Sequence, residues 1–306
     1  MGQKSAGSGV AGRRISRANL VFEYSSRSKP CARIAPGETV IVETKWAYGE
    51  HDVKQGDKLS DLDVNKCDPL TGPIFVETAE PGDTLAVHLL DIELKGQGGQ
   101  GIIPGLGILP WADLPVHMFT PSGGHIEWLR GIRVETRPNL GCIGVAPAGD
   151  PIPSIWPGDH GGNMDTRYCC AGSTVFFPVF HPGALLLMGD CHQMQGDGEL
   201  CGVAPETDSD VTLRCEVIKG KAIKRPRVMA ESRFMTVASA ETLEEAVRLA
   251  TSDMIDVLVE EKGLTRDEAY LLTAIKADAE ICQVVDPLMT ARVAMDRKFF
   301  ESLQPR

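Results

Sequence analysis

The stretch that decides the fold is residues 84–94, which read TLAVHLLDIEL and directly follow a PGD turn signal at residues 81–83. Aliphatic residues dominate this run, and a Pro-Gly-Asp sequence is typical of the turn that precedes a strand. We therefore predict a β-strand over residues 84–94.

Further strands are predicted on both sides of this one. Apolar and β-branched runs that are bounded by Gly or Pro indicate strands over 38–44, 173–180, 184–188, 211–218 and 227–236. Short strands at such close spacing favour a β-sandwich or barrel over a parallel sheet with crossover helices. The chain is accordingly predicted to be β-rich to about residue 238.

The C-terminal part of the sequence changes to a helical pattern. Thr242 begins a capping-box sequence, apolar residues then recur at helical spacing, and Gly263 is suited to end the helix. Thr265 begins a second helix of the same kind. We predict an α+β, mostly β fold with a β-sandwich-like core and a helical or α+β C-terminal portion over residues 239–306.

Composition restricts the partners and the domain organisation. Lys and Arg number 31 against 42 Asp and Glu, a net charge of −11, so we expect binding to neither nucleic acid nor membrane surfaces. No apolar run approaches the ~20 residues of a membrane-spanning helix. Nine cysteines without a CxxC pair favour a reduced, cytoplasmic protein over a disulfide framework. We expect a flexible tail over residues 1–14 and one unit over residues 15–306.

The unusual polar residues are concentrated in two glycine-rich segments. Residues 157–167 read PGDHGGNMDTR, and residues 189–199 read GDCHQMQGDGE directly after the strand predicted at 184–188. Glycine allows the backbone to adopt positive φ and to approach a ligand closely. Both segments therefore have the character of functional loops.

Asp190 and His192 provide ligand chemistry for a divalent metal. If the preceding strand continues, residues two apart face the same side, so both side chains can reach one point. Carboxylate and imidazole groups are suitable ligands for Zn²⁺, and Glu199 or Asp165 could complete the site or act as a base. The alternative is a set of hydrogen-bonded loop residues that bind no metal.

Cys191 offers a different mechanism, in which its thiol would attack the substrate with His192 or Glu199 as the base. Neighbouring residues on a strand point to opposite faces, which argues against the pairing of Cys191 with His192.

With these residues in view, the sequence resembles the acetamidase/formamidase family. The resemblance begins near residue 30 and covers most of the remaining chain. It is carried by PLTGPI at 69–74, AEPGDTLAV at 79–87, GVAPA at 144–148, HGGNMDT at 160–166 and the run at 189–199 with Glu206 beyond it. It implies hydrolysis of a small carboxamide, a sandwich-like fold, a bound divalent metal and a homo-oligomer. Some relatives act on cyclic amides, so a lactam is an alternative substrate.

The sequence departs from the family pattern at a few positions. Gln193, Met194 and Gln195 stand where a small residue usually follows the His, and Pro205 interrupts an expected strand. The segment 44–53 also lacks the usual turn. These departures motivate the alternative of a small-molecule binding protein without catalytic activity.

We combine these observations in one hypothesis. Asp190 and His192 hold a divalent metal, zinc or alternatively calcium, with Asp165 as third ligand. Glu199 transfers protons, and Asn163 with glycine N–H groups stabilises the oxyanion. His160 is a further catalytic candidate. The expected partners are a small amide substrate and further copies of the chain, as a dimer or larger homo-oligomer.

Overall fold

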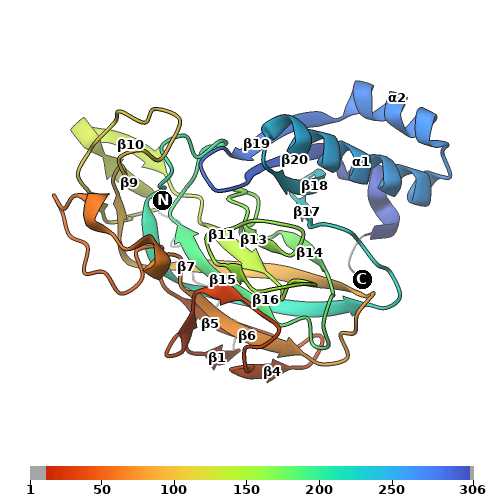
Figure 1. Cartoon of the computed structure of the whole chain (residues 1–306), viewed down its shortest axis with the longest axis horizontal. Coiled ribbons are helices and arrows are strands. Elements are labelled where there is room, and N and C mark those ends of the chain that lie inside the picture. Colours follow the sequence, from red (N-terminus) through yellow and green to blue (C-terminus); the bar gives the residue numbers. More distant parts are fainter. Residues whose placement is uncertain (1–11, 304–306) are drawn as a thin grey trace, which may run out of the picture.

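The computed structural model describes residues 12–303, and its main feature is one branched and largely antiparallel sheet of sixteen strands (Figure 1). Its main path runs through β13 (Gly161–Asn163), β11 (Asn139–Gly144), β15 (Leu186–His192), β16 (Glu206–Ile218), β7 (Thr84–Gln100), β14 (Thr174–Pro178), β17 (Arg227–Ala230), β18 (Arg233–Ala240), β20 (Met289–Asp296) and β19 (Asp278–Gln283). The branches are β1 (Arg13–Ile15), β2 (Leu20–Val21), β4 (Ala32–Ile34), β5 (Thr39–Thr44), β6 (Leu70–Val76) and β8 (His117–Phe119).

Smaller elements surround this sheet. Two separate pairs of strands are β9 (His125–Trp128) with β10 (Ile132–Glu135), and β3 (Glu23–Tyr24) with β12 (Ile152–Pro153). Short 3₁₀ segments lie at Leu59–Asp61, Val64–Lys66, Leu129–Gly131 and Arg297–Leu303. No helix within residues 12–303 is both long and apolar enough to cross a bilayer.

The main core lies within the branched sheet. It is built from inward-facing residues of many strands, among them Val42, Ile74, Val87, Leu140, Phe177, Met188 and Leu213. β15 and β16 are central to this arrangement because each pairs with three other strands. The mostly β, α+β class is thus confirmed, whereas the continuous pairing of sixteen strands does not establish two separate sandwich layers.

The two predicted helices are present. α1 (Leu243–Lys262) begins after Thr242, whose hydroxyl accepts a hydrogen bond from the Glu245 N–H, and it ends at Gly263 with φ of 65°. α2 (Arg266–Lys276) begins after Thr265 with a complete capping box. α1 packs on β18 and β20, so the helices cover one end of the sheet (Figure 1).

Three sequence predictions need correction. The segment 239–306 is not uniformly helical, because β19 and β20 follow α2 and extend the sheet. The single strand predicted over 227–236 is a hairpin, β17 and β18, that reverses at Glu231 with φ of 53°. Residues 1–11 of the predicted tail lie outside the described residues, and Arg13 and Arg14 belong to β1, which pairs with β5.

Candidate active site

β15 delivers two side chains to one buried point. Asp190 and His192 lie two residues apart on this strand, and His192 Nε2 donates to Asp190 Oδ1 at 3.2 Å. Both residues are buried, at 3% and 1% exposure. The alternation predicted from the sequence therefore places this pair as expected.

Gly141 of the neighbouring strand makes room for this pair. A Cβ atom on Gly141 would lie 2.0 Å from Asp190 Oδ2 and 2.5 Å from Asp165 Oδ1. Only a residue without a side chain leaves space for both carboxylates at this position on β11.

Four carboxylates surround the Nε2 atom of His192. Its distances are 3.2 Å to Asp190 Oδ1, 3.5 Å to Glu206 Oε1, 3.8 Å to Asp165 Oδ1 and 3.9 Å to Glu199 Oε1. We call these five residues the acid cluster. All five are buried, and they come from β15, β16 and the loops that contain residues 165 and 199.

The opposite side of the His192 ring faces neutral amides. Nδ1 lies 3.2 Å from Gln195 Oε1 and 3.2 Å from Asn139 Nδ2, and Asn139 donates to Gln195 at 2.7 Å. Gln195 also donates to the backbone carbonyl of Asp165 at 2.8 Å. These contacts fix the orientation of the ring, so that Nε2 points towards the carboxylates.

Burial and mutual repulsion change the proton affinities in the acid cluster. Burial raises the pKa of Glu199 well above its usual value, and Asp165 and Asp190 raise it further. Burial and Asp190 raise the pKa of Asp165 to about 6. Burial opposes ionisation of His192, but Glu206 and Asp190 raise its pKa well above the usual value. For Asp190, the penalty of burial is outweighed by His192, and its pKa is lowered.

Several cluster residues adopt an unusual backbone conformation. Asp165, Asp190 and Glu199 have φ values of 45°, 52° and 42°. Positive φ is uncommon outside glycine, and residues held in it tend to be found at functional sites. The backbone strain therefore coincides with the predicted site.

Three acidic groups near this site were not predicted as functional. Glu206 lies opposite His192 in the pairing of β15 with β16. Asp68 and Asp286 are close enough for the cluster to raise their pKa values further, after the larger effect of burial, through Asp190 and Asp165 respectively. The sequence offers a weak signal for Glu206, which lies just beyond the run at 189–199, and we identify none for Asp286.

Asn163 contacts Cys142, the residue that follows Gly141 on β11, whereas the structure does not bring His160 into the acid cluster. Asn163 pairs with Cys142 across β13 and β11, and the Cys142 thiol donates to Asn163 Oδ1 at 3.1 Å. His160 packs edge-on against Tyr24, with ring centroids 4.7 Å apart, and burial lowers its pKa to about 4. No hydrogen bond or ion pair within the described residues joins His160 to the acid cluster.

Cys191 points away from the site into the main core. It is fully buried, and burial raises the pKa of its thiol to about 12. A reactive thiol needs a lowered pKa and access to the substrate. The arrangement therefore argues against a thiol mechanism.

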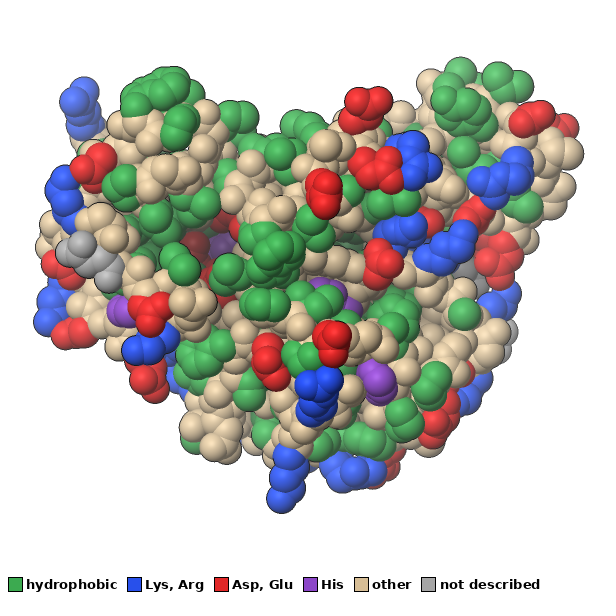
Figure 2. Space-filling model, in the orientation of Figure 1, with side chains coloured by type: hydrophobic (Ala, Val, Ile, Leu, Met, Phe, Trp, Pro, Cys, Tyr) green, Lys and Arg blue, Asp and Glu red, His purple; other side chains and the backbone are tan. Residues whose placement is uncertain are grey.

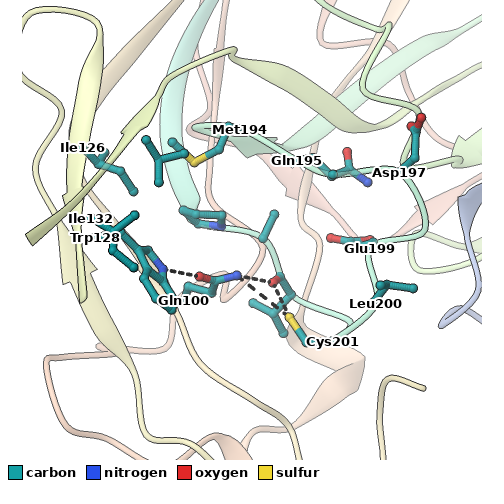
Figure 3. Close-up of a pocket in the computed structure, with 15 residues that line it drawn as sticks. Gln100, Ile126, Trp128, Ile132, Met194, Gln195, Asp197, Glu199, Leu200 and Cys201 are labelled. Atoms are coloured by element: carbon teal, nitrogen blue, oxygen red, sulfur yellow. Dashed lines mark hydrogen bonds between the residues drawn. The ribbon is translucent and has the colours of Figure 1, made fainter. Parts of the chain in front are cut away.

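A cavity of about 500 Å³ reaches the acid cluster at Glu199. Gln195 and Asp197 lie on the same side of the cavity as Glu199, whereas Ile126, Trp128 and Ile132 lie on the other side (Figure 3). Figure 2 shows a recess beside the lobe of β9 and β10, with acidic and His side chains visible in its floor. Small molecules can thus reach one carboxylate of the cluster.

Residues 28–156 and 148–302 match the model of the Acetamidase/Formamidase family. The chain belongs to this family. An acetamidase of Mycolicibacterium smegmatis is 28% identical over 62% of this chain and 63% of the relative. A putative formamidase of Schizosaccharomyces pombe is 30% identical over 61% of each. The match thus spans less than two thirds of the length of either curated relative.

Solved structures of family members have the same fold over almost their whole length. An acetamidase from Bacillus halodurans superposes with a TM-score of 0.91 at 37% identity, covering 95% of this chain and 100% of the other. A predicted acetamidase/formamidase from Thermoanaerobacter tengcongensis gives 0.91 at 36%, covering 95% and 97%. A gamma lactamase from Delftia acidovorans shares the fold, with a TM-score of 0.66 at 23% identity, covering 92% and 89%.

In this family member, the acid cluster fits a divalent cation. Two groups of three have their ligand atoms within 4.8 Å of one another: Asp165, His192 and Glu199, and Asp190, His192 and Glu206. Both Asp165 oxygens and Glu206 Oε2 are buried without a hydrogen-bond partner in the described part of the chain. Tetrahedral ligands at about 2.1 Å from an ion would lie about 3.4 Å apart, close to the observed separations.

Proposed function

We propose that this chain hydrolyses the C–N bond of a primary carboxamide, giving a carboxylate and ammonia, with help from a bound divalent metal. The observation that carries the proposal is the position of Glu199. This residue belongs to the acid cluster and also lines the cavity, where a substrate can reach it. The names of the related acetamidases and formamidases support the same reaction.

Each residue has a defined part in this proposal. Asp190, His192 and Asp165 would hold the metal, and Glu206 would add a third carboxylate beside His192 Nε2. A divalent cation supplies Lewis acidity, which polarises the amide carbonyl and lowers the pKa of water. We keep zinc as the expected ion and calcium as the alternative, because the site is rich in oxygen ligands.

Glu199 moves the proton. A carboxylate that lines the cavity beside the metal ligands can accept a proton from attacking water and return it to the departing amine. Gly196 lines the cavity beside it, and its N–H has no hydrogen-bond partner among the described residues, so it is free to stabilise the oxyanion. Asn163 stays a candidate for the same role, and His160 for a supporting one.

The test is ammonia release from formamide, acetamide and larger amides by the Glu199→Gln variant. Turnover should fall by ~10²-fold or more, because the amide cannot accept the proton. Cys191→Ala is the matched control and should keep near-normal activity, since this thiol faces the core. An unchanged rate in Glu199→Gln would remove Glu199 from the mechanism.

The metal is tested separately. Exhaustive chelation should abolish ammonia release, and added Zn²⁺ should restore it. Full activity after chelation would contradict the metal-assisted reaction. If no amide, linear or cyclic, were hydrolysed with metal present, the alternative of a non-catalytic binding protein would be favoured.

We also propose that the chain forms a homo-oligomer and that it is located in the cytoplasm. A homo-oligomer is supported by exposed apolar residues on α2, with Leu271 and Ile275 at 70% and 74% exposure. Light scattering on the purified protein tests this. The cytoplasmic location stays a prediction from the sequence.

A further inference from the structure

The cavity is much larger than the smallest amides require. Acetamide has four heavy atoms, which occupy on the order of 100 Å³ if each takes about the ~30 Å³ of a water molecule. The cavity measures about 500 Å³. Acetamide bound at Glu199 would therefore leave most of this space to solvent.

The wall opposite Glu199 is apolar. The β9–β10 pair provides Ile126, Trp128, Ile132 and Val134, and Met194 adds a thioether to the same surface. Figure 3 places the labelled members of this group across the cavity from Gln195, Asp197 and Glu199. An amide that binds here with its carbonyl at Glu199 would thus extend its acyl group towards Trp128.

Trp128 is held in place by a chain of hydrogen bonds. Its indole Nε1 donates to Gln100 Oε1 at 3.4 Å, and Gln100 Nε2 donates to the backbone carbonyl of Val203 at 3.1 Å. Gln100 and Val203 also line the cavity. An aromatic face with a fixed orientation provides apolar contact at a low cost in conformational entropy.

We propose that the preferred substrates are primary carboxamides with a large apolar acyl group, such as a hexanoyl or arylacetyl group, and that Trp128 determines this specificity. The proposal rests on the proposed amide hydrolysis. Water adds to the carbonyl carbon, the C–N bond breaks, and the products are the apolar carboxylate and ammonium. The acyl group remains against Trp128 while these bonds change at the Glu199 end.

The experiment compares acetamide, butanamide, hexanamide and phenylacetamide as substrates of the metal-loaded protein. Each buried methylene contributes about a fourfold gain in binding, so kcat/KM for hexanamide should exceed that for acetamide by on the order of 10²-fold. Interactions that are equal in the ground and transition states appear mainly in KM. The preference should therefore be expressed as a lower KM.

Substitutions in the cavity wall then test whether Trp128 determines the preference for hexanamide over acetamide. Trp128→Ala should lower the hexanamide-to-acetamide ratio of kcat/KM by about tenfold, and Trp128→Phe should retain most of it. Trp111→Ala is the matched control, because Trp111 is 77% exposed and does not line the cavity. Ile132→Ser, at a half-exposed position in the same wall, should lower the ratio if Trp128→Ala fails to fold.

Calorimetric titration of the same amides separates this proposal from the proposed function. Hydrolysis of all four amides with acetamide preferred, or an unchanged ratio in both wall variants, would overturn the apolar-acyl specificity and leave amide hydrolysis standing. Absence of ammonia release with every amide would overturn the proposed function. In that case, tighter binding of hexanamide than acetamide, weakened by Trp128→Ala, supports the acyl site, and equal binding overturns it.

Discussion

At Gly141, a single hydrogen atom in place of a side chain keeps two carboxylates close together. A Cβ atom here would overlap both Asp190 Oδ2 and Asp165 Oδ1. The backbone of Gly141 is not in a conformation reserved for glycine, so the effect of a substitution would come from the side chain alone. A substitution at Gly141 therefore changes the geometry of the acid cluster without changing any of the five residues that form it.

We predict that Gly141→Ala leaves the fold intact but displaces both carboxylates. A misplacement of about 1 Å at reacting groups can cost ~10²-fold in rate, so kcat/KM for amides should fall by about that factor. Metal content after dialysis, measured by elemental analysis, should fall as well. Gly149→Ala is the control, since no atom lies within 4 Å of its Cβ position. Normal activity and metal content in Gly141→Ala would show that the carboxylates have other productive positions.

Residue patterns in the sequence predicted part of this site. Asp190 and His192 could be paired because strand alternation is a local rule, and their contact at 3.2 Å follows from it. Glu206 could not be paired with His192 in the same way. Their contact depends on the register between β15 and β16, which residue types alone do not specify.

The predicted start of β16 explains why Glu206 is not among the predicted site residues. β16 was predicted from Val211, where apolar alternation begins, but the strand starts at Glu206 and its first five residues read ETDSD. These polar residues are nevertheless mostly buried, because β16 is hydrogen-bonded to strands on both sides. The helices were predictable because their caps, Thr242 and Thr265, act within one turn of the chain.

β20 carries a buried cation that connects the C-terminal elements with the loop that contains Asp197 and Glu199. Arg292 is fully buried, and it donates to Asp197 Oδ2 at 2.6 Å and to Glu280 Oε2 at 2.7 Å. Its guanidinium also lies over the Tyr168 ring at 4.7 Å. Asp197 is two residues from Glu199, so this contact positions the loop that contains the proposed base.

We predict that Arg292→Met lowers both stability and activity. The substitution removes the charge-assisted hydrogen bonds of the buried guanidinium, so the free energy of unfolding should fall by about 2 kcal/mol in denaturant titrations. Asp197 and Glu280 are partly exposed and each keeps another arginine partner, which limits the loss. The kcat/KM should fall too, because the loop around Asp197 loses its anchor. Arg266→Met is the control, since Arg266 forms an exposed pair with Asp256. A stable Arg292→Met protein with normal kcat/KM would show that the loop is held by other contacts.

In the folded molecule, four buried carboxylates surround the imidazole of His192, which can neutralise only one of them. The repulsion between the remaining carboxylates can be reduced in two ways, by protonation of the carboxylates or by binding of a divalent cation. Protons are favoured in the metal-free protein, as the raised pKa values of Asp165, Glu199 and Glu206 indicate. A cation would displace those protons, so metal binding and pH should be linked.

Proton binding by the acid cluster should make the stability of the chelated protein depend on pH. Asp165 has a pKa of about 6 in the folded protein against its ordinary 3.8, so between these values the folded state binds more protons than the unfolded state. The free energy of unfolding of chelated protein should therefore decrease as pH rises from 4 to 7, by about 3 kcal/mol from Asp165 alone. His192, whose pKa is also raised, continues the loss at higher pH.

Metal-loaded protein should behave differently, because the cation stabilises the deprotonated carboxylates. The difference in unfolding free energy between loaded and chelated protein should thus grow from pH 5 to pH 8, as measured by denaturant titration at each pH. Asp165→Asn is the control and should flatten the pH dependence of the chelated protein, since an amide does not titrate in this range. A chelated protein whose stability rises over the same interval would show that the acid cluster ionises freely without a metal.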